Sequence, residues 1–339
     1  MHAARNPEAE PRSAPSSPFW HVGYPKSAST TLQVCLFDKH PDINNFGIYP
    51  IHNVGFRHRI DEVDSDCAFV TNPGLRELYR MLVEDSGTEY DPMTARKLKK
   101  NIESDVERKG KATVFSVEGL TSVFFGFPRI EARARRLHDL WPDANVFFLI
   151  RNQFDIIQSQ YRDWPFDPRR ADVGEPVPIR EWLEIDMNLS NSFVKSLLYS
   201  DVVKCYADLF GRKNVTVFLF EQLVKDTSGF AQDLSAYLGI NAQITEDLLS
   251  QEGQNRGVSK YYNLYRRLRR RFFPEGLGLR SILPNRLVDK AHEILRRGDK
   301  EKHELGAVWT KRLHDLYANS NAELAEEFDL DLRRYDYPL

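Results

Sequence analysis

Short apolar runs alternate with helical patterns along most of the chain. The run Val146–Ile150 is apolar at every position, which is the pattern of a strand buried on both faces of a parallel sheet. Further strands are predicted at the start of Phe19–Leu36, in Ala112–Glu118 and from Val215 onward. Helical spacing of apolar residues predicts helices in Leu75–Val83, Met93–Glu107, Ile130–Leu140, the segment that follows Arg151, and Phe230–Ile240.

This alternation predicts an α/β fold with a central parallel sheet flanked by helices. The 339 residues suffice for one large domain. Residues 1–17 are rich in Pro, Ala, Ser and Glu, which predicts a disordered N-terminal tail. Residues 18–339 are predicted to form a single domain with variable insertions near 38–112 and 163–180, the second of which contains several prolines.

The segment Phe19–Leu36 reads FWHVGYPKSASTTLQVCL and predicts a strand, a tight turn and the start of a helix. The N-terminus of a helix favours an anion, because it presents free amides and the positive end of the helix dipole. Small residues after the turn let the backbone approach a ligand closely, and Lys26 adds a mobile charge. The predicted phosphate cradle comprises Lys26, Ser27, Ala28, Ser29, Thr30 and Thr31. The alternative is an ordinary helix with a Ser or Thr N-cap.

A second motif follows the strand Val146–Ile150. Arg151 ends this strand, and Ser159 lies eight residues later in the predicted helix. Ligands of α/β folds bind at the carboxyl edge of the sheet. An arginine there can bind a phosphate through two parallel hydrogen bonds, and a serine can add a neutral donor. The alternative is a surface arginine beside a serine that only packs the helix.

The composition indicates a globular protein and argues against several other classes of protein. Hydrophobic residues make up 41% and charged residues 28% of the chain, which are globular values. The net charge of −2 predicts no nucleic-acid partner. Cys35, Cys67 and Cys205 are too far apart for a disulfide framework, and no cluster has metal-ligand spacing, so no metal is predicted. No apolar run reaches the length of a transmembrane helix, and the N-terminus lacks the pattern of a signal peptide.

The two motifs together resemble those of sulfotransferases that use 3′-phosphoadenosine 5′-phosphosulfate (PAPS). In that family, strand–PKSGTT–helix surrounds the 5′-sulfate and strand–R–x₇–S binds the 3′-phosphate. This chain has PKSASTT at residues 25–31, where Ala28 replaces the usual glycine and Ser29 the usual threonine, and then Arg151 with Ser159. Val215–Leu223 resembles the late strand of the family with its E-x-L turn. The resemblance covers roughly residues 18–260, together with Leu305–Leu339.

The resemblance implies a P-loop-like, three-layer fold and a PAPS-dependent transferase whose nucleotide product is 3′-phosphoadenosine 5′-phosphate (PAP). Lys26 would lie against the leaving oxygen, and residues 27–31 would hold the 5′-phosphosulfate. Arg151, Ser159, Arg256 and Gly257 would hold the 3′-phosphate. Tyr199 is similar to the tyrosine that contacts the adenine, although a core aromatic on an amphipathic helix is the alternative.

Glu118 is the predicted catalytic base. It follows the apolar strand that begins at Ala112 and precedes Gly119, which places its carboxylate at the carboxyl edge of the sheet. Carbohydrate-modifying members of the family use a glutamate as the base, so the chain resembles that type. The alternative is a glutamate that pairs with an arginine or caps a helix. His52 and His58 are weaker candidates, because no strand orients them.

The predicted acceptor is a hydroxyl of a glycan or glycolipid, with a small alcohol or phenol as the alternative. A nucleotide kinase is less favoured, because Pro25 stands where a Walker A loop needs its second glycine. A non-catalytic nucleotide-binding protein is the third class. Golgi members of the family carry a membrane anchor that this chain lacks, which predicts a soluble, bacterial-type cytoplasmic enzyme. The basic stretch 266–271 predicts either a peripheral membrane contact or a solvated helix face.

Overall fold

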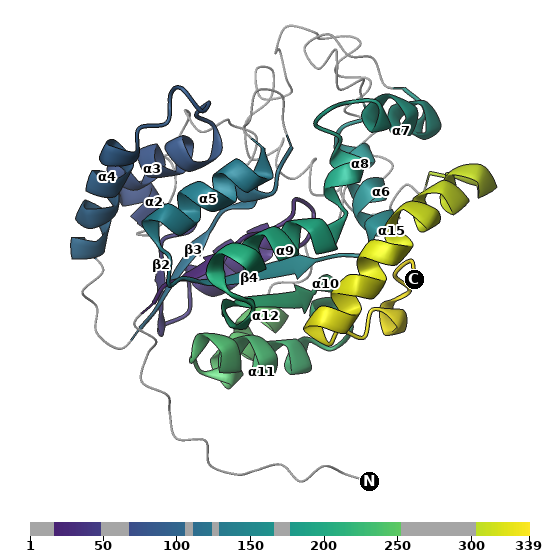
Figure 1. The fold of residues 1–339 in the computed structure, drawn as a ribbon. Coiled ribbons are helices and arrows are strands. Elements are labelled where there is room, and N and C mark those ends of the chain that lie inside the picture. The colour runs from purple at the N-terminus through teal and green to yellow at the C-terminus, as the bar shows by residue number, and fades with distance from the viewer. Residues whose placement is uncertain (1–16, 49–67, 106–110, 124–128, 166–176, 252–302) are drawn as a thin grey trace, which may run out of the picture.

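The computed structural model describes residues 17–48, 68–105, 111–123, 129–165, 177–251 and 303–339. Its centre is a five-stranded sheet in the order β2-β3-β1-β4-β5, in which every neighbouring pair is parallel (Figure 1). The strands are β1 (Phe19–His21), β2 (Ile43–Asn45), β3 (Ala112–Ser116), β4 (Asn145–Ile150) and β5 (Val215–Leu219). The predicted parallel sheet is confirmed.

Both faces of the sheet are buried. Successive side chains of a strand point to opposite faces, and in β4 Val146, Phe148 and Ile150 belong to one apolar core while Phe147 and Leu149 belong to another. The first core includes residues of α3, α5, α9 and α15, and the second includes residues of η1, α11 and α12. The layers are therefore helix, sheet and helix (Figure 1), which confirms the predicted α/β fold.

The helical elements are α1 (Ser29–Thr31), the π-helical η1 (Leu32–Phe37), α2 (Ala68–Thr71), α3 (Pro73–Val83), α4 (Pro92–Asp105), η3 (Glu118–Leu120), α5 (Ile130–Leu140), α6 (Gln153–Asp163), α7 (Ile179–Met187), α8 (Phe193–Ser196), α9 (Tyr199–Phe210), η5 (Arg212–Asn214), α10 (Phe220–Lys225), α11 (Thr227–Leu238), α12 (Ala242–Gln251), α15 (Gly306–Phe328) and η7 (Arg333–Tyr335).

The long periodic segments match their predicted bounds well, and α5 matches them at both ends. The predicted strand Ala112–Glu118 is too long, because the chain turns into η3 at Glu118, whose carbonyl accepts from the amide of Thr121 at 3.2 Å. The predicted strand from Val215 ends at Leu219, so the E-x-L sequence lies in α10. The edge strand β2 was not predicted, because its sequence INN has little strand propensity.

The strand order brings three loops together. β1 lies between β3 and β4. The chain runs from β1 to β2 and β3 on one side, and the connection from β3 then crosses to β4 on the other side. Such a reversal of strand order opens a crevice at the carboxyl ends of the strands, where α/β folds bind their ligands. The residues that follow these three ends are the turn at 22–28 after β1, Glu118 after β3 and Arg151 after β4.

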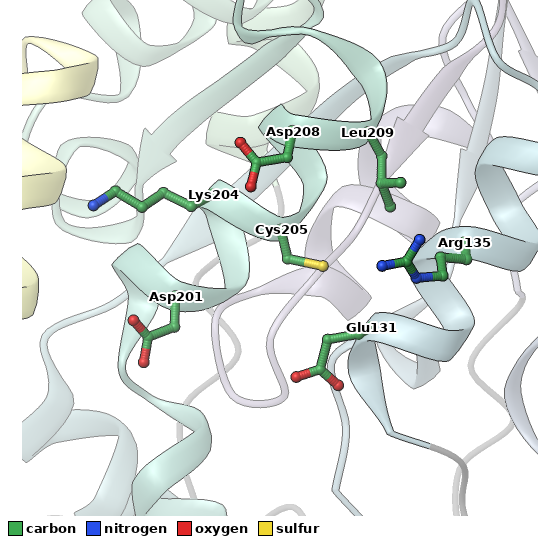
Figure 2. A pocket seen from close by; sticks show the side chains of 7 residues that line it. All are labelled: Glu131, Arg135, Asp201, Lys204, Cys205, Asp208 and Leu209. Carbon is green, nitrogen blue, oxygen red and sulfur yellow. The ribbon is translucent and has the colours of Figure 1, made fainter.

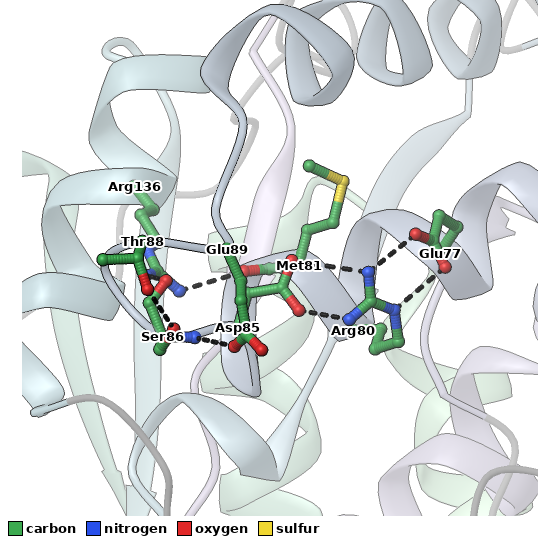
Figure 3. Close-up of polar contacts among 8 residues, drawn as sticks. All are labelled: Glu77, Arg80, Met81, Asp85, Ser86, Thr88, Glu89 and Arg136. Carbon is green, nitrogen blue, oxygen red and sulfur yellow. Dashed lines mark hydrogen bonds and ion pairs between the residues drawn. The ribbon is translucent and has the colours of Figure 1, made fainter.

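Helices α3 and α4, in the described part of the insertion predicted near 38–112, pack beside α5. Arg136 of α5 donates from Nη1 to the Met81 carbonyl at 3.0 Å and from Nη2 to the Ser86 carbonyl at 3.2 Å (Figure 3). Its guanidinium carbon also lies 4.3 Å from the centre of the Tyr90 ring. These contacts fix the end of α3 against α5.

The end of α3 in turn packs against the residue after Glu118. A Cβ atom on Gly119 would lie 2.7 Å from Cγ1 and 3.0 Å from Cγ2 of Val83, which is the last residue of α3 and is buried. A valine side chain has little rotamer freedom with which to move away. Glycine at position 119 therefore lets α3 approach the turn that carries Glu118.

Substituting Gly119→Ala should lower the free energy of unfolding by about 1–3 kcal/mol, the usual cost of an overpacked methyl group. Urea denaturation measures it. Val83→Ala removes the two methyl groups that the new Cβ would meet, so Gly119→Ala should cost less in that background. If the costs of the two substitutions simply add, the close contact is not the reason for the glycine.

Candidate active site

The turn after β1 is held in a strained conformation. The amide of Ser27 donates to the carbonyl of Tyr24 at 3.4 Å, Pro25 is the second residue of the turn, and Lys26 has a φ of 67°. Proline followed by a positive φ is the pattern of a type II turn, in which glycine or asparagine usually takes the third place. A lysine persists there because the surrounding structure fixes the backbone.

Ala28 is the second left-handed residue, with φ 61° and ψ 19°. It precedes the helix: the amide of Leu32 donates to its carbonyl at 3.0 Å. The observed φ gives a physical reason for the glycine that the related motif carries at this position, because glycine takes this conformation without strain.

Gly23 lies against Ser29, the first residue of α1. A Cβ atom there would lie 2.6 Å from Ser29 Oγ and 2.9 Å from Cε1 of His21, so a larger residue does not fit. The side chain of Ser27 is buried, and its hydroxyl has no hydrogen-bond partner within the described part of the chain. A buried hydroxyl without a partner is costly, so this one suits a ligand oxygen.

Arg151 joins the second motif to the cradle. Its Nη1 donates to the carbonyl of Lys26 at 2.9 Å, and its guanidinium carbon lies 4.5 Å from the centre of the Phe220 ring. Its Nε is buried and has no partner among the described residues. The hydroxyl of Tyr199 donates to the Arg151 carbonyl at 2.6 Å. The guanidinium therefore contacts the cradle and keeps N–H groups that can donate to a ligand.

A buried carboxylate, Glu221 of α10, supports the loop that carries Arg151. Glu221 accepts from the amide of Asn152 at 2.9 Å and from the hydroxyl of Tyr337 at 2.8 Å. Burial raises the pKa of Glu221, and these two hydrogen bonds act against the rise. Asn152 also donates to the carbonyl of Asp336 at 2.8 Å. The C-terminal segment is therefore tied to the end of β4.

Glu118 lies beside the cradle. It is half-buried, and burial raises the pKa of its carboxyl, whereas a hydrogen bond from the Ser29 hydroxyl and the charge of Lys26 lower that pKa. The amide of the preceding residue, Val117, donates to the carbonyl of His21 at 3.0 Å, which aligns this segment with β1. The structure therefore places Glu118 near Ser29 and Lys26.

Asp163 is a site residue that the sequence analysis missed. It is the last residue of α6, and its carboxylate forms an ion pair with the ammonium group of Lys26. Ser159 lies one helical turn before it, on the same face of α6. The ion pair of Asp163 therefore brings the end of α6, one turn beyond Ser159, to the cradle.

Two residues near the candidate site, Tyr199 and His21, are buried in the core. Tyr199 is fully buried, and its ring packs edge-on against Tyr24 with 4.8 Å between ring centres. It therefore packs as a core aromatic, and its hydroxyl donates to the Arg151 carbonyl. His21 is also fully buried, and burial lowers its pKa to about 3. Its Nδ1 lies 2.8 Å from Oγ of Ser116. His21 is therefore neutral and braces β1 against β3.

Several predicted positions lie outside the described residues: Cys67, the loop with Arg256 and Gly257, the candidate bases His52 and His58, and the basic stretch 266–271.

A separate cleft lies between α5 and α9. It has a volume of about 350 Å³ and is lined by charged side chains of both signs around Cys205 (Figure 2). Its lining residues are Glu131, Arg135, Asp201, Lys204, Cys205, Asp208 and Leu209. None of them was predicted for the site, and the cleft takes no residue from the loops after β1, β3 or β4.

Neither a metal nor a membrane feature emerges from the described residues. Among them, no group of three or more His, Cys, Asp or Glu side chains is placed to hold a metal ion. Within the same ranges, no helix has the length and apolar character needed to cross a membrane.

The comparisons with known proteins show what the fold is. No family model matches the chain, and no curated protein sequence matches it. A sulfotransferase structure from Alicyclobacillus acidocaldarius is similar over 95% of this chain and 99% of that chain, with a TM-score of 0.50 and 19% identity. This likeness shows that the chain has a sulfotransferase fold.

Two other solved structures are more distant. One is the sulfotransferase domain of the Synechococcus PCC 7002 olefin synthase, with 15% identity, a TM-score of 0.42, and 93% of this chain and 98% of that chain covered. The other is mouse sulfotransferase SULT7A1 complexed with PAP, with 14% identity, a TM-score of 0.39, and 71% of this chain and 66% of that chain covered.

The left-handed backbone at position 28 gives a direct test of the cradle geometry. Ala28→Gly should raise the free energy of unfolding by roughly 1 kcal/mol, because an alanine in this conformation costs about 1–2 kcal/mol and part of the gain is offset by the greater freedom of glycine in the unfolded chain. Urea denaturation measures the change. Ala318→Gly, in the middle of α15, is the control and should lower stability by a similar amount. A loss of stability in Ala28→Gly would contradict the left-handed cradle.

Proposed function

We propose that this protein is a sulfotransferase that moves the sulfuryl group of PAPS to a hydroxyl of a glycan or glycolipid. The observation that carries the proposal is the convergence of Lys26, Glu118 and Arg151 at the carboxyl ends of three adjacent strands. One carboxylate and two cations at a crevice of this kind suit a donor that carries several negative charges and a proton-bearing acceptor.

The residues present fit PAPS as the donor. The buried hydroxyl of Ser27, which has no partner among the described residues, and the close approach permitted by Gly23 suit a group of oxygens at the turn. We assign Ser27, Ala28, Ser29, Thr30 and Thr31 to the 5′-phosphosulfate. Arg151 has an Nε without a partner in the described part of the chain and contacts the cradle, and we assign it to the 3′-phosphate together with Ser159, Arg256 and Gly257.

The chemistry is an in-line transfer. The acceptor oxygen forms a bond to sulfur while the bond from sulfur to the bridging oxygen of the donor breaks, and PAP leaves with that oxygen. Glu118 accepts the proton of the acceptor hydroxyl, and Lys26 stabilises the charge that develops on the leaving oxygen. Transfers of this kind depend mainly on positioning and electrostatic stabilisation. Lys26 supplies the neutralising charge, so the proposal requires no metal.

The acceptor class rests on Glu118. A glutamate in this position is the base of the carbohydrate-modifying sulfotransferases that the chain resembles, which favours a glycan or glycolipid over a small alcohol or phenol. Incubation with sulfur-labelled PAPS and matched panels of glycans, glycolipids and small phenols tests the assignment. Label on glycans or glycolipids is expected. Label on phenols alone would contradict the acceptor class, and transfer of phosphate from ATP would contradict the reaction.

The assignment of Arg151 and Ser159 to the 3′-phosphate predicts two losses of PAP affinity, one larger than the other. Arg151→Ala should weaken PAP binding by about 10–100-fold, because a charged hydrogen bond contributes roughly 1.5–3 kcal/mol, and Ser159→Ala by about 5-fold. Titration calorimetry measures both. Adenosine 5′-phosphosulfate lacks the 3′-phosphate and is the control, since its affinity should change little. If the wild-type protein binds both nucleotides equally well, the assignment of Arg151 is wrong.

Glu118→Gln should keep PAP affinity and lower the transfer rate by about 10²–10⁴-fold, because it removes the proton acceptor. The raised pKa also sets the pH dependence: the base must be ionised, so activity should rise with pH through a midpoint above the ordinary glutamate range and then level off. Initial rates between pH 4 and 9 measure this.

Stability provides the control for Glu118→Gln. The folded chain holds the Glu118 proton to a higher pH than the unfolded chain, so stability falls as pH rises through that window and stays lower above it. The variant should therefore be at least as stable as the wild type at pH 7. An inactive variant that also unfolds more easily would point to a structural glutamate.

A further inference from the structure

The ion pair between Lys26 and Asp163 is not part of the proposed transfer. Both side chains are partly exposed, at 32% and 31% of their surface, so the pair lies near the surface and not inside the core. Asp163 comes from the end of α6, whereas Lys26 comes from the turn after β1. The contact therefore joins two elements that are far apart in sequence and adjacent at the crevice.

The position of Asp163 at the C-terminal end of α6 favours a cation beside its carboxylate. The C-terminal end of a helix carries a partial negative charge, so an acidic side chain in the last turn is repelled by it. Asp163 is the last residue of α6, and Lys26 supplies the compensating charge. Lys26 in turn stands between two carboxylates, because Glu118 also interacts with its charge. The cation that should bind the donor is thus already neutralised.

We propose that Asp163 is the internal counter-ion of Lys26, which the phosphosulfate displaces when the donor binds. The inference rests on the proposed function. Asp163 is a positioning residue: it holds the lysine stem beside the cradle while no anion is present, and it competes with the donor for the ammonium group. The long flexible stem of lysine lets the charge pass from one partner to the other without a backbone movement.

The test is the affinity for PAP in Asp163→Asn. This substitution removes the competing charge and keeps the size of the side chain, so PAP should bind about 2–5-fold more tightly, the range expected for a partly exposed ion pair. Calorimetry at low ionic strength measures it, because salt screens such pairs. A substitution that only disturbed the structure would weaken binding, so tighter binding is specific to the proposal.

Two controls sharpen the result. Asp139→Asn removes the same charge from an exposed position near the end of α5, the helix that leads into the amino end of β4, and it should leave PAP affinity unchanged. In a Lys26→Met background, Asp163→Asn should no longer tighten PAP binding, because the shared cation is gone. A gain that persists in this background would show that Asp163 acts on the ligand directly and not through Lys26.

The outcomes separate the two claims. If the wild-type protein binds PAP and Asp163→Asn binds it equally well or more weakly, the counter-ion role of Asp163 is wrong, while the sulfotransferase proposal stands. If neither protein binds PAP, the donor assignment itself fails, and the counter-ion inference fails with it.

Discussion

The hydrogen bond from Arg151 Nη1 to the Lys26 carbonyl joins the two halves of the candidate site, and the geometry of the site depends on it. This contact is possible only because β1 and β4 are parallel neighbours, so that the loops after both strands open at the same edge. The pairing of β1 with β3 adds Glu118 on the other side. The hydroxyl of Tyr199 and the carboxylate of Glu221 then fix the backbone around Arg151, which leaves its guanidinium free to bind.

Burial raises the pKa of two carboxylates in this region, Glu118 and Glu221, but the two have different surroundings. Glu221 accepts hydrogen bonds from Asn152 and Tyr337 and is a structural anchor. Glu118 is stabilised by one serine hydroxyl and by the shared charge of Lys26. A carboxylate kept partly buried with so few donors lowers stability, and such costs are typical of functional sites. The left-handed backbone at Lys26 is also energetically unfavourable, and backbone strain of this kind is likewise typical of functional sites.

The sequence predicts elements whose pattern is local. The apolar run of β4 and the amphipathic helix α5 needed no tertiary information, and the rule that α/β sheets bind ligands at the carboxyl edge sufficed to predict that Glu118 and Arg151 lie there. Asp163 was missed because its role depends on the direction of α6, which ends beside the cradle, and no periodicity encodes direction. The strand β2 was missed because its two asparagines are poor strand formers, and only pairing with β3 makes it a strand.

The most direct test of the central claim is a crystal structure of the protein with PAP bound. The account predicts the 5′-phosphate at the turn of residues 25–31, the 3′-phosphate on the guanidinium of Arg151, and the ammonium group of Lys26 moved from Asp163 to the nucleotide. PAP bound anywhere other than the carboxyl edge of β1 and β4, or bound there with its phosphates away from Lys26 and Arg151, would contradict it.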